Sequence, residues 1–156
     1  MKIRLYTLFV ILGFFVAILA NAQRAQSALG GSVDSIEADK EALSAVQGAV
    51  ASHTGYTVQE IASAGNTVRE YVSPSGVVFG IAWSGLVPPD LTQLLGSYVG
   101  EYQEALQKTP RRKGSRHLRV DTPGLIVEKW GHMRNLQGRA YAPALIPPGV
   151  SVDEIK

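Results

Sequence analysis

The sequence predicts a single α+β domain in which two helices pack on one face of an antiparallel sheet of about five to six strands, behind an N-terminal signal peptide. Three observations predict this. The chain begins with a short charged segment and an apolar run, two later segments repeat apolar side chains at helical spacing, and five or six short segments have strand character. The expected order is helix, three strands, helix, then two or three strands, which favours helices on one side of the sheet.

Residues 1–22 have the pattern of a secretory signal. Lys2 and Arg4 give a positive start, residues 5–20 are almost entirely apolar, and the Ala-Asn-Ala stretch behind them offers the small side chains that a signal peptidase recognises. An apolar run of 16 residues is short for a membrane span of about 20, so we expect cleavage. The protein is therefore expected to be exported to the periplasm or beyond, and to meet the membrane only through its signal peptide.

Cleavage would leave 134 residues carrying 13 basic and 13 acidic side chains. The isoelectric point near 9.0 therefore describes the precursor and does not indicate a nucleic-acid partner. The chain has no cysteine, which excludes disulfides, thiol nucleophiles and thiolate metal sites. No cofactor motif is present, and we expect no cofactor.

The remaining chain divides into three parts. Residues 23–34 are expected to be a flexible lead-in, 35–146 the α+β domain, and 147–156 an extended, loosely held tail. A capping pattern that begins at Asp34, with apolar residues at helical spacing behind it, predicts a first helix over 35–52.

A three-strand antiparallel meander is expected next. The segments "GYTVQEIAS" and "NTVREYVS" alternate apolar and polar residues, whereas "VVFGIAWSG" is apolar throughout and suits a central strand. Turn residues separate the three segments. Gly80, inside the third, indicates a bulge or a close backbone approach.

A second helix is predicted over 91–108, because Asp90 can cap it and apolar residues recur along one stripe. Tyr98 and Tyr102 belong to that stripe. Two further strands, "RHLRVD" and "LIVEKWG", are expected to form a hairpin, and "GRAYAPALI" to supply one more strand after a reversal over 135–138.

The stretch "VEKWGHMRNLQGRAY" crowds candidate ligand-binding side chains between Val127 and Tyr141. Strand alternation places Lys129 on the face of Val127, and places Glu128, Trp130 and His132 on the other face. In a ligand site, the aromatic rings would form apolar walls, an arginine would hold an anion, and the histidine would change charge near neutral pH. In a purely structural role, the tryptophan would cover the edge of the core and the polar groups would satisfy turn carbonyls. The candidates are Trp130, His132, Arg134, Asn135, Arg139 and Tyr141.

A basic segment, "KTPRRKGSRHLR", lies between the second helix and the next strand. It can contact a polyanion, such as the phosphates of lipopolysaccharide or of wall polymers, or it can be a solvated loop. It has no interleaved aromatic residue for base stacking, so no nucleic-acid partner is expected. The candidate polyanion contacts are Arg111, Arg112, Lys113 and Arg116.

The familiar catalytic motifs are missing. His53, His117 and His132 lack zinc-ligand spacing, so no metal site is predicted. Ser84 lacks the first glycine of a nucleophile elbow. Glu70 and Glu128 would make a carboxylate pair for glycoside cleavage only if they were brought together, and both occupy alternating strand positions that solvent usually takes. Together these observations favour a protein that is not an enzyme.

Three segments, "EYVSPSGVVFGIAWSG", "PDLTQLLGSYVGEY" and "VEKWGHMRNLQGRAYAPALIPPGVS", resemble a bacterial family of small exported proteins known as a domain of unknown function. The resemblance covers nearly all of the mature chain and implies an exported single domain, with no assigned reaction or ligand. We therefore expect a non-catalytic binding or interaction module of the cell envelope, whose partner is a protein, a glycan or a lipid. The alternative is a small hydrolase or ligand-modifying enzyme with a site near Trp130, His132 and Arg134.

Overall fold

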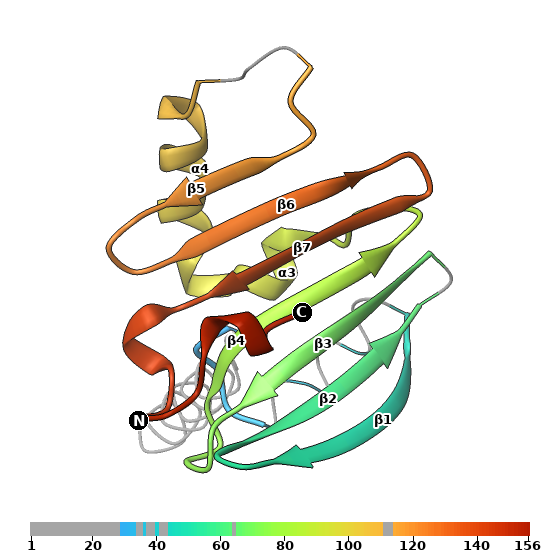
Figure 1. The fold of residues 1–156 in the computed structure, drawn as a ribbon, viewed down its shortest axis with the longest axis vertical. Coiled ribbons are helices and arrows are strands. Elements are labelled where there is room, and N and C mark those ends of the chain that lie inside the picture. The colour runs from blue at the N-terminus through green and yellow to red at the C-terminus, as the bar shows by residue number, and fades with distance from the viewer. Residues whose placement is uncertain (1–28, 34–35, 37–39, 41–43, 64, 111–113) are drawn as a thin grey trace, which may run out of the picture.

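The computed structural model describes residues 29–33, 36, 40, 44–63, 65–110 and 114–156. These residues form one seven-stranded antiparallel sheet with the strand order β1-β2-β3-β4-β7-β6-β5 (Figure 1). The strands are β1 (Val46–His53), β2 (Tyr56–Ala62), β3 (Asn66–Val72), β4 (Val78–Gly85), β5 (Leu118–Asp121), β6 (Ile126–His132) and β7 (Asn135–Tyr141). The predicted antiparallel α+β domain is confirmed, with more strands than the five or six expected.

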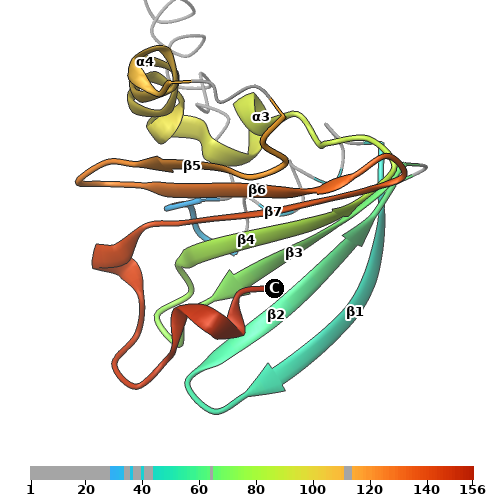
Figure 2. The same ribbon diagram turned by 45° about the horizontal axis from the view of Figure 1, so that its top comes forward.

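The helical layer lies on one face of the sheet and the C-terminal segment on the other (Figure 2). Among the described residues, the layer is one interrupted helix of 18 residues: α3 (Leu91–Leu95), the 3-10 turn η1 (Gly96–Tyr98) and α4 (Val99–Lys108). It spans the predicted range of 91–108. As expected, Asp90 caps it, since a carboxylate oxygen accepts a 2.8 Å hydrogen bond from the Thr92 amide.

The predicted first helix over 35–52 is wrong in its second half, where the chain forms the edge strand β1. Every residue of β1 is exposed, so its side chains show no alternation of apolar and polar character. Val46 and Val50 matched helical spacing only because the segment is rich in small apolar residues. Most of 35–43 lies outside the described residues, although Ile36 is buried in the core.

The meander of β2, β3 and β4 is confirmed, and β4 is its most buried strand. Of the two alternatives for Gly80, the bulge is confirmed, and the close neighbour is a side chain and not backbone. The register between β3 and β4 shifts next to the Tyr71–Gly80 pair, and a Cβ atom at Gly80 would lie 2.9 Å from Ile155 Cδ1. Without a side chain at this position, Ile155 of the C-terminal segment packs directly against the strand.

Apolar side chains form a core on each face of the sheet. The larger core lies under the helices, and the smaller one lies under the C-terminal segment. The segment 147–156 was expected to be loosely held, but it contains the 3-10 turn η3 (Val152–Glu154), closed by a capping box from Ser151. Ile155 is fully buried, and Tyr71 Oη donates a 2.8 Å hydrogen bond to the Lys156 carbonyl. A second 3-10 turn, η2 (Pro143–Leu145), leads into this segment.

The two strand carboxylates also differ from the prediction. Glu70 and Glu128 are both buried, although alternation suggested solvent positions. They lie on opposite faces of the sheet, because Glu70 is level with Ile81 and Glu128 is level with Arg139. The two carboxylates therefore cannot flank a common substrate.

Candidate functional site

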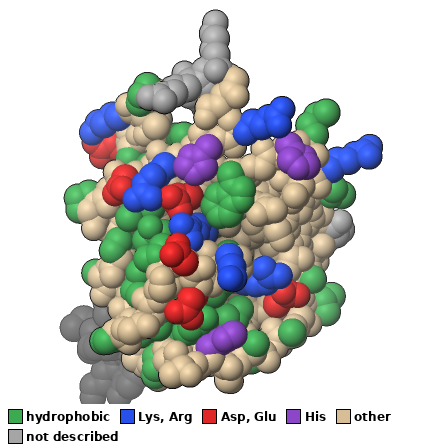
Figure 3. Space-filling view, in the orientation of Figure 1, with side chains coloured by type: hydrophobic (Ala, Val, Ile, Leu, Met, Phe, Trp, Pro, Cys, Tyr) green, Lys and Arg blue, Asp and Glu red, His purple; other side chains and the backbone are tan. Residues whose placement is uncertain are grey.

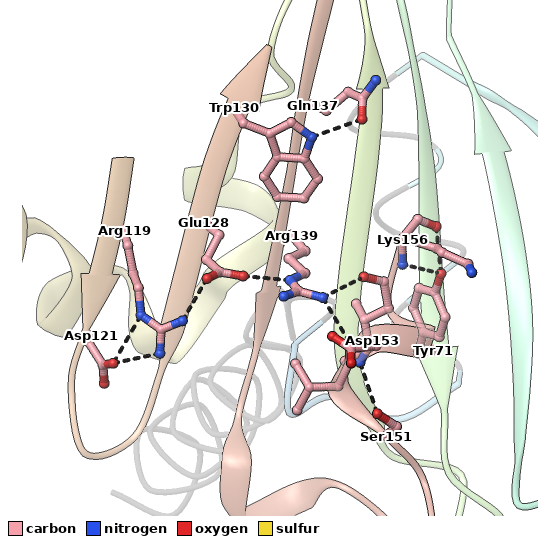
Figure 4. Close-up of polar contacts among 12 residues, drawn as sticks. Tyr71, Arg119, Asp121, Glu128, Trp130, Gln137, Arg139, Ser151, Asp153 and Lys156 are labelled. Atoms are coloured by element: carbon pink, nitrogen blue, oxygen red, sulfur yellow. Dashed lines mark hydrogen bonds and ion pairs between the residues drawn. The ribbon is translucent and has the colours of Figure 1, made fainter. Parts of the chain in front are cut away.

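A row of charged side chains crosses β5, β6 and β7 on the face opposite the helices (Figure 4). The register places Arg119 opposite Glu128, and Glu128 opposite Arg139. Arg119 Nη1 and Arg139 Nε each donate a 2.6 Å hydrogen bond to one of the two oxygens of Glu128. Arg119 also donates to Asp121 from Nη2, at 2.8 Å. The row is therefore internally paired.

The environment of Glu128 keeps it ionised. Burial raises the pKa of Glu128, but the hydrogen bonds and positive charges of Arg139 and Arg119 outweigh burial and lower the pKa below its ordinary value. Hydrogen bonds from Arg119 to Asp121 and Glu128 raise the pKa of the guanidinium further above neutrality. Burial, and then the charge of Glu128, raises the pKa of Tyr141. Glu128 and Arg119 are thus both charged at neutral pH.

Arg139 ties this row to the C-terminal segment. Its Nη1 donates to the carbonyl oxygens of Val152 and Ile155, at 2.9 and 3.3 Å. Its donors are therefore directed at the protein itself, and its side chain is only 18% exposed. Tyr141 is buried in the smaller core. Both residues are candidates for ligand binding from the sequence, and in the structure their side chains contact the protein itself.

An open pocket of about 720 Å³ lies between the end of α4 and the strands β5 and β6. We call it the cationic pocket. The strand β5 begins at Leu118, opposite Lys129, so beyond that point β6 is paired with β7 but has no described strand on its other side, and the pocket reaches Trp130 there. Its described lining consists of Tyr102, Leu106, Thr109, Pro110, Ser115, Arg116, His117, Leu118, Arg119, Lys129, Trp130, Gly131 and Leu136.

The charge in this lining is of one sign. It includes Arg116, Arg119 and Lys129 but no aspartate or glutamate. Arg119 is neutralised by its own carboxylates, whereas Arg116 and Lys129 form no ion pair with any residue in the described ranges. Lys129 Nζ instead donates a 2.7 Å hydrogen bond to Tyr102 Oη, which leaves its other two N–H groups for a ligand.

Trp130 lines the pocket at the open edge of β6, and its side chain points to the sheet face opposite that of Lys129, where polar contacts hold it in place. Trp130 Nε1 donates a 3.0 Å hydrogen bond to Gln137 Oε1 (Figure 4). Gln137 Nε2 in turn donates a 2.8 Å hydrogen bond to Asn135 Oδ1. Trp130 is half-buried, so part of its ring faces solvent. A fixed, partly exposed indole can stack on a flat ligand without losing much conformational freedom on binding.

The structure brings together Trp130 and Arg116, which came from two separate sequence predictions. Arg111, Arg112 and Lys113 lie outside the described residues. The candidates His132, Arg134 and Asn135 lie at the exposed tip of the β6–β7 hairpin instead of in the pocket. In Figure 3, which views the sheet face opposite the helices, cationic and histidine side chains gather along the upper edge.

The reversal predicted over 135–138 is wrong. Asn135 already pairs with His132, so the turn consists of Met133 and Arg134, and 135–138 belongs to β7. Arg134 takes the left-handed conformation with φ of 68°. The prediction failed because Asn and Gly are the residues that usually mark such a turn, and here both lie within the strand.

Sequence reasoning missed Lys129 and Tyr102 as pocket residues. The signal for Lys129 was present, because alternation placed a lysine on the same face as the core residue Val127. A cation at a core-facing position needs an opening to solvent or a partner, and the pocket provides both. For Tyr102, helical spacing alone indicated only a core position.

Among the described residues, no helix is long and apolar enough to cross a membrane, and no cluster of His, Asp and Glu side chains is arranged to hold a metal ion. No curated protein and no solved structure shows significant similarity to the chain. A family model described as "Protein of unknown function (DUF2844)" matches residues 25–155.

Proposed function

We propose that this chain, which belongs to the DUF2844 family of proteins of unknown function, is an exported, non-catalytic binding module of the cell envelope. Its cationic pocket would bind an anionic saccharide, meaning a sugar ring that carries a carboxylate or a phosphate. The N-terminal signal pattern supports export. One observation carries the proposal. Within the described residues, the lining of the cationic pocket has cations without an ion-pair partner, an indole ring held by a hydrogen bond, and no carboxylate.

Each part of such a ligand has a matching group in the pocket. Lys129 and Arg116 can donate charge-assisted hydrogen bonds to its acidic oxygens. Trp130 offers a flat apolar surface for the face of the sugar ring. A volume of about 720 Å³ lies within the range of small-ligand pockets, so one or two rings would fit.

The test is a fluorescence and calorimetric titration of the mature protein with three probes: a glucuronic acid disaccharide, a sugar phosphate and a neutral disaccharide. We expect binding of one or both acidic probes and none of the neutral one. Lys129→Met keeps the length of the side chain but removes its charge, and it should weaken binding by about tenfold or more. Lys108→Met is the matched control. Lys108 is the last residue of α4, pairs with Glu104 and does not line the pocket.

Two outcomes would contradict the proposal. Equal binding of neutral and acidic saccharides would remove the role of charge. Unchanged affinity in Lys129→Met, with a loss in Lys108→Met, would place the ligand elsewhere.

The alternative hydrolase near His132 gains no support from the described geometry. The His132 ring is exposed at the hairpin tip, and its Nδ1 lies 3.1 Å from the neighbouring Met133 carbonyl oxygen. A general base needs a proton to abstract within hydrogen-bond reach, and the described contacts bring no serine or threonine hydroxyl to this ring.

A further inference from the structure

A second surface lies at the rim of the sheet where β4 ends and the β6–β7 hairpin turns. Leu86 and Val87 follow β4 and are 58% and 57% exposed, and Met133 in the hairpin turn is 90% exposed. Gly85 pairs with Leu136, so the two loops leave the sheet from adjacent strands, about 5 Å apart. Figures 1 and 2 both show the end of β4 and the hairpin at this same rim. We call these three residues the apolar tip.

The backbone of the tip is fixed, so its apolar side chains are held out in solvent. The Leu86 amide donates a 2.7 Å hydrogen bond to the Gly65 carbonyl, and Asn66 Nδ2 donates to the Val87 carbonyl at 3.4 Å. Exposed apolar side chains that gather at one rim are typical of an interaction site, whereas single scattered ones are not.

The charge around the tip is positive. Arg134 sits next to Met133, is exposed, and forms no ion pair within the described ranges. The segments 83–89 and 129–137 contain no acidic residue. The nearest carboxylate along the chain, Asp90, is engaged by the Thr92 amide.

Arg134 also occupies a position that a glycine would fill at lower cost. With φ of 68°, a residue with a Cβ atom loses about 1 kcal/mol relative to glycine. The Arg134 side chain lies in solvent at an exposed turn, so it does not offset this backbone strain through contacts within the protein. Such strain points to a role for the cation in binding another molecule.

From the apolar tip and its flanking cation we infer that this rim docks on an anionic lipid bilayer. The three apolar side chains enter the headgroup boundary, and Arg134 meets the negative surface. Interfacial binding of this kind grows with buried apolar area and with attraction to anionic lipids. The inference stands on the rim alone and does not require that the cationic pocket bind a saccharide.

The two surfaces are nevertheless neighbours. Gly131 and Leu136 pair with each other and line the pocket. The next pair along the hairpin, His132 and Asn135, is the last before the turn that carries the apolar tip. A bilayer at the tip therefore lies beside the mouth of the pocket, where acidic saccharides attached to lipids would be presented.

The test is flotation of the mature protein with vesicles of phosphatidylglycerol and phosphatidylcholine in equal amounts, against vesicles of phosphatidylcholine alone. We expect binding to the anionic vesicles and much less to the neutral ones. The triple variant Leu86→Ser, Val87→Ser, Met133→Ser should lose roughly tenfold or more in vesicle affinity. The double variant Val33→Ser, Val50→Ser is the matched control, because these valines are 39% and 56% exposed and lie away from the rim: Val33 bonds Gly76 in the turn at the other end of β4, and Val50 lies in the middle of β1, opposite Gln59.

A variant that folds at least as well tests the cation separately. Arg134→Gly should raise the melting temperature and still weaken binding to anionic vesicles by several-fold. Lys129→Met should keep vesicle binding even if it loses saccharide binding, which separates this inference from the proposed function. The inference is overturned if the wild-type protein does not bind anionic vesicles, or if the triple variant binds them as well as wild type does. The apolar tip would then be a candidate contact for a protein partner.

Discussion

Replacing Arg139 with glutamine is expected to lower the free energy of unfolding by about 3 kcal/mol without changing ligand affinity in the cationic pocket. Arg139 was a plausible anion-binding residue from sequence. In the structure its guanidinium joins the buried Glu128 to the carbonyl oxygens of Val152 and Ile155. Loss of the guanidinium therefore removes hydrogen bonds to Glu128 and to the C-terminal segment at once.

The magnitude follows from burial and from the partners that stay behind. Removing one member of a buried ion pair costs about 3–5 kcal/mol, because the other charge is left without its partner. Glu128 keeps its bond to Arg119, and the Arg139 side chain is 18% exposed, so the lower end applies. A loss of about 3 kcal/mol lowers the ratio of folded to unfolded protein roughly a hundredfold. For a domain of this size it lowers the melting temperature by about 10 °C.

The assay is urea unfolding followed by tryptophan fluorescence, together with limited proteolysis of the C-terminal segment. Arg134→Gln is the control, because Arg134 is an exposed arginine at the neighbouring hairpin tip, and its replacement should change stability by less than about 0.5 kcal/mol. A loss below about 1 kcal/mol for Arg139→Gln, or no faster cleavage after residue 146, would refute the structural role argued for Arg139.

Two further changes test the same region of the sheet. The folded-state pKa of Glu128 is lowered, so its stabilising effect is present above the pKa of the unfolded carboxyl and is lost as pH falls through the lower folded-state pKa. Glu128→Gln should therefore be less stable than wild type at pH 7, and the difference in unfolding free energy should shrink in acid; a gap that stays constant in acid would contradict this account. Gly138→Ala should cost several kcal/mol, about 3 or more, because its Cβ would meet the Trp83 ring and the Glu128 carbonyl oxygen. A melting temperature within error of wild type would show that the sheet accommodates the methyl group.

Local patterns predicted most of the fold correctly because the elements concerned are half-buried. The strands β2, β3, β5 and β6 and the helix over 91–108 repeat apolar side chains with the period of the face that they bury. The strand β4 is recognised by its continuous apolar character instead, because both of its faces are buried. The strand β7 was predicted only in its second half, because its start has the residues of a turn. The edge strand β1 was missed, since it is exposed throughout and its small residues match a helix as well as a strand.

The candidate site was predicted only in pieces. Trp130 and Arg116 were singled out for separate reasons, and nothing in their spacing showed that they line one pocket. The short length of β5 decides this, because it leaves the end of β6 open beside the loop that carries Arg116. Conversely, Arg139 and Arg134 looked equivalent in sequence, but one is paired inside the fold and the other is free at a hairpin tip.

The sequence by itself determined the properties that depend on composition and local periodicity: the absence of cysteine, an antiparallel α+β domain and its family. Tertiary structure alone decided which charges are neutralised. Pairing depends on strand register and on which segment covers each face, and both are set by contacts between residues far apart in the chain. The C-terminal segment covers Arg139 and holds it within the fold, while the gap beside β6 leaves Lys129 and Arg116 open to a ligand.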